Sequence, residues 1–471
     1  MERATLTVGK FRSRDPVFGP KAGLGALLIL ALWGAAQAQA PTTVPTRPDP
    51  FQKLSLLDVG RMASSWSSLP SGSGCQQGQA GTSGHAMLLA ESSDAEQDNP
   101  QGPFSLVEPR HRLQLDATGQ VGCVFGQLAV QRQVDPAGDY WSWDGSAISW
   151  RIDEYWRVGA GRIARQWGPA WDGSLILGTA ARPFLNLSVE AASGPLARDG
   201  FWWWLGEVDF SAFFGELEDD RGDYARPYLM GSRIVVRPWP WLELGASRTA
   251  MWGGEGRDNS FITFLKSVLG RDNSCNGSDC SGQPGNQLAG FDVRLSLDRW
   301  LPGIALYGQV IGEDGRPETS IVPAKNMYQA GAEWRHDDAL VFAEWTDSTA
   351  GPAGVAYNHP IYSDGYRHRG RPLGFWADGD SSLWTVGGLR RDLFGGQALA
   401  VLRYGTLNES GASTTWPTSR LSSASLQWRT VFDRVFGLTL ALDHVNVSSL
   451  RGGDAGWRDT VLRLQFDAWL D

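Results

Sequence analysis

Apolar and polar residues alternate with a period of two along many segments of this 471-residue chain. Every second residue is apolar from Phe291 to Leu297, and the same alternation runs from Leu462 to Leu470. Successive side chains of a strand point to opposite faces, so these segments have one apolar and one polar face. No segment after residue 40 approaches the run of about 18 apolar residues that a transmembrane helix needs. The pattern therefore predicts an all-β fold.

Eighteen such segments follow one another along the chain. The predicted strands span 86–92, 109–116, 122–133, 144–152, 156–164, 185–193, 201–213, 229–237, 241–250, 288–297, 302–311, 326–336, 339–347, 383–391, 397–405, 420–430, 436–446 and 457–468. Short and long connections alternate between them, and every long one falls at the same end. A soluble sandwich or propeller has no reason to keep this parity. We therefore predict a transmembrane antiparallel β-barrel of about 18 strands with short periplasmic turns and long extracellular loops.

The first 40 residues have the features of a signal peptide. A basic start precedes the apolar run from Leu24 to Trp33, and small residues at 36–40 offer two cleavage sites. Without this segment the formal net charge is −12, which argues against a nucleic-acid partner. We expect residues 86–471 to form the barrel in the outer membrane of a Gram-negative cell, surrounded by outer-membrane lipid. Residues 41–85 form a periplasmic N-terminal segment rich in Pro, Ser and Gly.

The tryptophans and the charged strand residues fit the two faces of such a barrel. Tryptophans predicted to form a girdle near the short turns are Trp202, Trp203, Trp204, Trp239, Trp241, Trp300 and Trp469. Polar residues predicted to line the lumen include Asp292, Arg294, Arg463 and Asp467. Four cysteines are compatible with an oxidising compartment. Cys275 and Cys280 are spaced to close a small loop, whereas Cys75 and Cys123 either pair with each other or stay free.

Three long loops combine aromatic rings with carboxylates, amides and arginines. A ring can cover the apolar face of a sugar while planar polar groups bind its hydroxyls, so this composition is typical of sugar-binding surfaces. The candidate polysaccharide-binding residues are Trp167, Trp171, Arg182, Trp252, Glu255, Arg257, Asp258, Asn259, Tyr357, His359, Tyr362, Asp364, Tyr366 and Arg371. The alternative is that these residues only order the loops over the barrel mouth.

Carboxylates in the same loops allow two further hypotheses. Glu255, Asp258, Asp378 and Asp380 offer the pair of carboxylates that a glycosidase needs. No nucleophile triad or metal-ligand spacing accompanies them, so we predict that the protein is not an enzyme. Asp378-Gly379-Asp380 and residues 272–279 offer oxygen ligands for calcium but match no defined loop. We therefore predict no cofactor, with calcium as the alternative.

Several long strings of the chain resemble the Wzi family of outer-membrane lectins, which take part in capsule assembly. The matching strings are QWGP from Gln166, GSLI from Gly173, ARP from Ala181, LELGASRTAMWGGEGRDNSF from Leu242, PGNQLAGFDV from Pro284, YGQVIGED from Tyr307 and YNHPIYSDGYRHRGRPLG from Tyr357. The resemblance implies an occluded eighteen-stranded barrel that binds capsular polysaccharide or exopolysaccharide at the cell surface after export. It brings no catalytic residues, and we expect a monomer.

The chain departs from the family at both ends. Members have a helical bundle before the barrel, whereas only Phe51 to Trp66 suits a short amphipathic helix here, so the periplasmic plug is predicted to be reduced or absent. The last strand ends Trp469-Leu470-Asp471 instead of on an aromatic residue. Without a plug, a porin-like channel is the main alternative function, and an accessory role in polysaccharide export is another.

Overall fold

The computed structural model describes most of the chain after residue 79. The described residues are 80–93, 111–135, 138–153, 155–193, 202–268, 285–313, 324–351, 354–411, 417–432, 435–450 and 456–470. The predicted signal peptide, residues 41–79 with Cys75, and residues 269–284, which include the segment 272–279, Cys275 and Cys280, lie outside them. Within these ranges, no helix has the length and apolar character needed to cross a bilayer.

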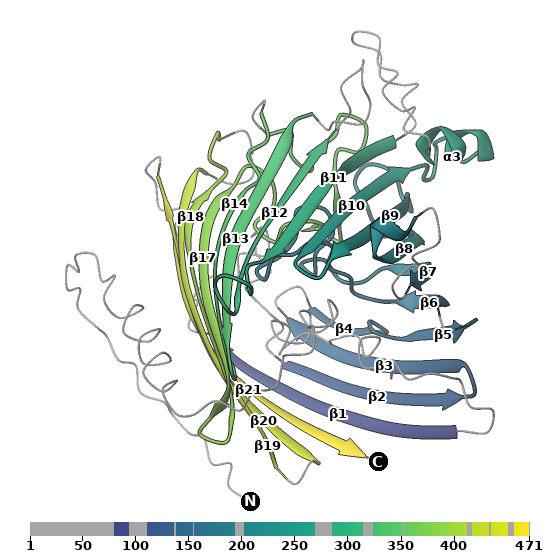
Figure 1. Cartoon of the computed structure of the whole chain (residues 1–471). Coiled ribbons are helices and arrows are strands. Elements are labelled where there is room, and N and C mark those ends of the chain that lie inside the picture. Colours follow the sequence, from purple (N-terminus) through teal and green to yellow (C-terminus); the bar gives the residue numbers. More distant parts are fainter. Residues whose placement is uncertain are drawn as a thin grey trace, which may run out of the picture. The chain divides into compact units, whose positions relative to one another are not determined.

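Antiparallel strands close into one barrel of eighteen positions (Figure 1). The strands are β1 (Ala80–Ser93), β2 (His111–Val121), β3 (Val124–Asp135), β4 (Gly138–Ser142), β5 (Ala147–Arg151), β6 (Trp156–Arg162), β7 (Leu185–Ala192), β8 (Glu207–Glu216), β9 (Tyr228–Trp239), β10 (Leu242–Trp252), β11 (Gly285–Ser296), β12 (Ile304–Glu313), β13 (Asn326–His336), β14 (Ala339–Asp347), β17 (Ser382–Leu393), β18 (Gly396–Leu407), β19 (Ser419–Phe432), β20 (Phe436–Ser449) and β21 (Trp457–Leu470). The short strands β4 and β5 both pair with β3 and together count as one of the eighteen strand positions in the barrel. Pairing of β1 with both β2 and β21 closes the sheet.

All eighteen predicted strands are present, and those at 326–336 and 339–347 match residue for residue. The bounds of the other strands differ from the predicted ones by one or more residues, and three of the differences change the predicted connections. Strand β1 begins at Ala80, within the predicted N-terminal segment. The predicted long connection at 134–143 is mostly strand, because β3 continues to Asp135 and β4 follows. The predicted strand at 201–213 begins only at Glu207.

The chain before β8 forms the 3-10 turn η2 (Trp203–Leu205) rather than strand. Gly206 follows it with a φ of 68°, and a Cβ at this position would lie 1.9 Å from the carbonyl oxygen of Arg237. Only glycine fits this close approach, so the extended conformation starts after it. The connection from β7 to β8 is therefore longer than predicted, although it lies at the short-turn end.

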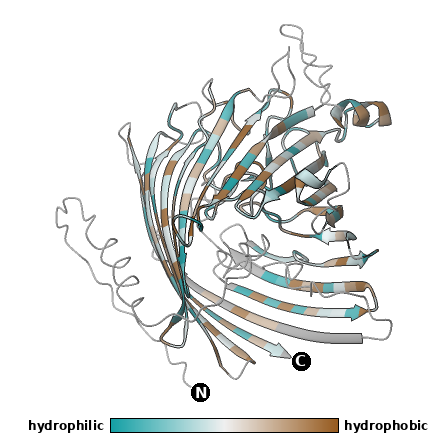
Figure 2. Ribbon diagram, viewed as in Figure 1, coloured by the Kyte–Doolittle hydropathy of each residue, from teal (hydrophilic) through white to brown (hydrophobic). Residues whose placement is uncertain are grey.

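Hydrophobic and hydrophilic residues alternate along the strands (Figure 2), and the two faces of the wall differ as this alternation predicted. On β21, Leu462 and Phe466 are 55% and 50% exposed, whereas Asp467 is 4% exposed. The predicted lumen residues form ion pairs across the inner face: Arg233 with Asp292, Arg294 with Glu333, and Arg463 with Asp443. An apolar outer face and a polar inner face are what a barrel in lipid requires.

The predicted tryptophan girdle is exposed at the short turns. Exposed members are Trp202, Trp203, Trp204, Trp239, Trp241 and Trp300, and Trp469 is half-buried. The rings of Trp239 and Trp241 stack with their centroids 5.2 Å apart. Large amphipathic rings at this level suit a membrane interface.

Regular structure also occurs inside two connections that were predicted as loops. Helix α3 (Phe261–Val268) follows β10, and a small hairpin of β15 (Arg367–His368) and β16 (Arg371–Pro372) lies between β14 and β17. Cys123, in the turn between β2 and β3, is disulfide-bonded, so it is not free.

Candidate functional site

The connection 163–184, between β6 and β7, enters the lumen, and we call it the inner loop. The indole Nε1 of Trp171 donates a hydrogen bond of 2.6 Å to Glu333, and its ring stacks on Phe342 at a centroid distance of 5.9 Å. The backbone N–H groups of Trp171 and Asp172 donate to the carboxylate of Glu344 at 2.5 and 3.0 Å. These partners lie on the inner faces of β13 and β14, so the inner loop occupies the barrel interior.

Asp172 is the second anchor of the inner loop. Its carboxylate accepts from Arg403 at 2.6 and 2.9 Å and from the hydroxyl of Thr385 at 2.7 Å. The indole of Trp376 donates to the same carboxylate at 3.3 Å. An arginine–carboxylate pair with several hydrogen bonds and little exposure is among the stronger polar contacts in proteins. The pair ties the inner loop to β17 and β18.

Gln309 of β12 supports the backbone of the inner loop. Its amide oxygen accepts from the N–H of Leu175 at 2.8 Å, and its amide nitrogen donates to the carbonyl of Trp167 at 2.9 Å. Gly168 has a φ of 143°, and a Cβ there would lie 2.7 Å from the amide nitrogen of Gln309. A glycine is therefore needed where the loop passes this side chain. Non-helical backbone inside the barrel thus finds polar partners.

Two buried tyrosines of the connection 348–381 hold this connection as a second layer over the inner loop. The hydroxyl of Tyr357 donates to the carbonyl of Leu175 at 2.7 Å and accepts from the N–H of Phe375 at 3.0 Å. The hydroxyl of Tyr366 donates to Ile176 at 2.9 Å. Burial raises the pKa of both phenols above the ordinary value, which keeps them protonated as donors. We call this layer the outer cover.

A buried ion-pair network joins the outer cover to the connection 217–227, between β8 and β9. The guanidinium of Arg221 binds Asp223 at 2.8 Å and donates to the carbonyls of Gly365 and Arg367 at 3.0 and 2.7 Å. Glu218 contacts the ring of His368. Burial by itself would raise the pKa of Glu218, but the hydrogen bond from His368 and those from backbone N–H groups outweigh it and hold this pKa below its usual range.

Above this network, the connections 217–227, 253–260 and 357–371 meet at an exposed surface that we call the three-loop junction. Arg226 and Glu255 form an exposed ion pair across two of them. The guanidinium of Arg257 lies 5.1 Å from the ring centroids of both Tyr224 and Tyr362. In the third connection, Asp364 accepts from the N–H of Gly222 at 2.7 Å.

The structure divides the predicted polysaccharide-binding residues into two groups. Fully or almost fully buried are Trp167, Trp171, Trp252, Tyr357, Tyr362 and Tyr366. Exposed or half-buried are Arg182, Glu255, Arg257, Asp258, Asn259, His359, Asp364 and Arg371. A buried ring offers no face to a sugar that approaches from outside, and the contacts of the first group order the loops. Polysaccharide binding by the second group stays a prediction.

Only some residues of the second group lie together in the structure. Glu255, Arg257 and Asp364 lie at the three-loop junction, and the side chain of Asn259 binds the backbone of Gly254 beside them. Elsewhere, Arg182 binds Asp144 at 2.6 Å, and the guanidinium lies over the ring of Tyr140. His359 accepts from backbone N–H groups of its own loop, and Arg371 lies in β16.

Sequence reasoning missed the connection 217–227 altogether. Its side chains Arg221, Asp223, Tyr224 and Arg226 supply much of the junction. The string DDRGDYARP from Asp219 has the same mixture of charge and aromatic rings as the loops that were selected. That composition was the available signal.

The four carboxylates considered for glycosidase chemistry have separate partners. Glu255 pairs with Arg226, Asp378 binds Arg367 at 2.8 Å, and Asp380 accepts from Ser410. Asp258 accepts from Ser260 and Thr263 at the start of α3. Among the residues that the structure describes, no three His, Cys, Asp or Glu side chains are grouped to hold a metal ion. Calcium binding at Asp378 and Asp380 stays a prediction.

Comparison with known proteins agrees with this architecture. The family model described as capsule assembly protein Wzi matches residues 107–455. An uncharacterized 55.8 kDa protein in the cps region of Klebsiella pneumoniae is 38% identical over 181 residues, which are 37% of this chain and only 34% of that protein. The solved structure of Wzi from Escherichia coli, described as an outer membrane protein involved in group 1 capsule assembly and a carbohydrate-binding β-barrel, superposes with a TM-score of 0.66. That comparison covers 81% of this chain and 83% of the other, at 23% identity, and shows the same fold. The chain is an outer-membrane β-barrel and belongs to the Wzi family of capsule assembly proteins.

Proposed function

We propose that this protein is a surface lectin whose three-loop junction binds a capsular polysaccharide or exopolysaccharide and retains it on the outer membrane. The observation that carries the proposal is the packing of the long connections. The aromatic rings among the candidate residues are buried in contacts that order these connections, and the side chains left exposed at the three-loop junction are mainly charged or polar. In this proposal a single chain binds the polymer without altering it chemically.

The chemistry of the junction supports binding of a hydroxyl-rich polymer. Arg226, Arg257 and Asn259 offer planar groups with paired donors, and Glu255 and Asp364 offer paired acceptors. Such groups bind neighbouring hydroxyls two at a time. Each contact on an exposed surface is weak, but repeats of one polymer that engage many copies of the barrel add through avidity.

The porin-like alternative fits the structure less well. Trp171 and Asp172 reach inner-face residues of β13, β14, β17 and β18, so the inner loop obstructs the lumen where an open pore would run. A conducting state would require these buried contacts to break. The sequence predicted a reduced or absent periplasmic plug. In this proposal the inner loop, which enters the lumen from the extracellular end, closes the barrel in its place.

Polymer retention tests the proposal directly. A strain lacking the gene is complemented with wild type, with an Arg257→Ala, Glu255→Ala double variant, or with Arg391→Ala at a short turn on the other side of the membrane. We expect the gene deletion and the double variant to shed polymer into the medium, and Arg391→Ala to retain it. Unchanged cell-bound polymer in the deletion strain would refute the proposal.

Two measurements on purified wild-type protein separate the other functions. Discrete conductance steps in a planar bilayer would favour a channel, whereas the lectin proposal expects a steady baseline. Shortening of polymer during incubation would favour a hydrolase. A glycan array with the same protein, with and without a calcium chelator, then identifies the sugar and the role of calcium.

A further inference from the structure

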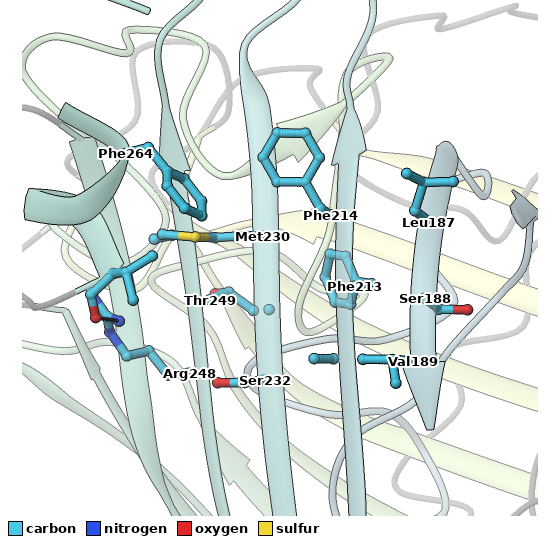
Figure 3. A pocket seen from close by; sticks show the side chains of 14 residues that line it. Leu187, Ser188, Val189, Phe213, Phe214, Met230, Ser232, Arg248, Thr249 and Phe264 are labelled. Carbon is cyan, nitrogen blue, oxygen red and sulfur yellow. Dashed lines mark hydrogen bonds between the residues drawn. The ribbon is translucent and has the colours of Figure 1, made fainter. Parts of the chain in front are cut away.

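A groove of about 430 Å³ lies on the outer side of the wall, between α3 and strands β7 to β10 (Figure 3). Phe264 and Val268 of α3 line it, and this helix lies outside the barrel (Figure 1). On the wall, the lining residues Leu187 and Phe214 are 63% and 36% exposed and alternate with buried Ser188 and Phe213. The groove therefore opens away from the lumen, toward the lipid.

The sequence of two neighbouring strands, β8 and β9, creates the hollow. Ala212 and Ser232 are paired in register, and the positions two residues away on the same face carry larger side chains. Phe214 is paired with Met230 on one side of them, and Phe210 with Ile234 on the other. Small residues between two large rows leave a trough in an otherwise apolar wall.

Helix α3 is fixed beside this trough by aromatic and polar contacts. The ring of Phe264 packs on Trp252 and Phe214 at centroid distances of 5.5 and 6.2 Å. Arg248 faces the groove and donates to the carbonyl of Val268 at 2.6 Å and to that of Ser267. These carbonyls lie at the negative end of the helix dipole, and they compensate the charge of Arg248 on the lipid-facing wall.

The free face of α3 is apolar. Phe261 and Ile262 are 70% and 66% exposed, and Leu265 is 40% exposed. Lys266 is also exposed on this helix. An apolar face with a basic side chain is typical of a helix that lies in a membrane interface. Because α3 belongs to a connection at the long-loop end of the wall, that interface is the outer leaflet.

We infer that the groove holds one acyl chain of a lipopolysaccharide molecule, whose anionic phosphates Lys266 attracts. Lipopolysaccharide is the acylated, phosphorylated lipid of the outer leaflet, so it matches the position, the apolar lining and the charge together. The barrel would then bind a resident lipid through its side wall, independently of any polymer bound at the three-loop junction.

Native mass spectrometry of the detergent-purified full-length protein tests the inference, with lipid A as the probe. We expect wild type to retain one lipid A and Ala212→Trp, which fills the trough, to lower its occupancy at least tenfold. The matched control is Ala424→Trp, which adds the same side chain at an exposed position on β19 and should bind like wild type. Lys266→Glu should weaken binding without filling the groove.

Each contrary result is decisive. Equal lipid A occupancy in wild type and Ala212→Trp would place the lipid elsewhere and overturn the inference. Equal retention of phosphatidylglycerol and lipid A by wild type would overturn lipopolysaccharide as the occupant. If Ala212→Trp fails to fold, Ser232→Leu fills the same trough with a smaller side chain, and Lys266→Glu tests the charge without touching the wall.

Discussion

Two long connections leave the same end of the barrel and turn in opposite directions. The inner loop, 163–184, turns into the lumen, whereas the connection after β10 carries α3 along the outside of the wall. The first has no regular helix and is held by side chains such as Glu344 and Gln309. The second is a helix held by ring packing and Arg248.

The difference shows what each face of the wall can support. Irregular backbone leaves N–H and C=O groups unpaired, and the polar inner face supplies carboxylates and amides for them. The outer face supplies almost none, and lipid supplies none, so a segment there must satisfy its backbone internally as a helix does. We therefore expect the two connections to be held independently, by these two kinds of contact.

The largest effect is expected from Asp172→Ala, which leaves Arg403 buried without its carboxylate. Breaking one partner of a buried pair costs about 3–5 kcal/mol, which should release the inner loop from β18. We expect single-channel conductance in planar bilayers where wild type has none. Arg132→Ala breaks an exposed ion pair with Asp139, serves as the control and should show no conductance. If Asp172→Ala showed no conductance, the other contacts of the inner loop would be enough to keep the lumen closed.

A smaller effect is expected from Tyr357→Phe in the outer cover. The carbonyl of Leu175 and the N–H of Phe375 would each lose a buried partner, at a cost of about 1–3 kcal/mol. Hydrogen exchange across residues 354–378 should accelerate. Tyr404→Phe removes an exposed hydroxyl from β18 and should change nothing. Unaltered exchange in Tyr357→Phe would show that the hydroxyl is not a structural tie.

Acid should loosen the outer cover before it affects the wall. Because the pKa of Glu218 is lowered in the folded protein, its carboxylate, which accepts hydrogen bonds from His368 and from backbone N–H groups, stabilises the cover above the ordinary glutamate pKa of about 4.3. This contribution is lost as the pH falls from that value through the lower, folded pKa. Protease cleavage in 357–371 should therefore rise over this window, and Glu218→Gln should abolish the pH dependence. Cleavage that rises equally in both proteins would point to another group.

The wall was predictable because alternation is a local property. The predicted bounds of strands β13 and β14 are exact, because the polarity of each side chain there indicates which face of the wall it lies on. The inner loop was not predictable in this way. Trp171 is bound by Glu333 and Glu344, which lie 162 and 173 positions further along the chain, and no local pattern links them.

The candidate site shows the same limit. The composition of the long loops favoured a sugar-binding surface, yet six of the selected aromatic residues are buried. A tyrosine that binds a sugar and one that ties two loops together have the same ring and hydroxyl, so composition does not distinguish them. Only the contacts separate Tyr357 in the outer cover from Tyr224 at the three-loop junction. Composition thus selected exposed and buried side chains of the long loops together and could not separate them.

The smallest effect on the barrel is expected from Arg248→Met on the outer wall. Near a membrane interface, a lipid-facing arginine costs only about 0–1 kcal/mol, and here its charge is already offset by the end of α3, so the unfolding temperature should hardly change. The carbonyls of Ser267 and Val268 would lose their donor, and protease cleavage near α3 should increase. Unlike Asp172→Ala, Arg248→Met should show no conductance in planar bilayers. Conductance in Arg248→Met would instead mean that the outward and inward connections are mechanically coupled through β10.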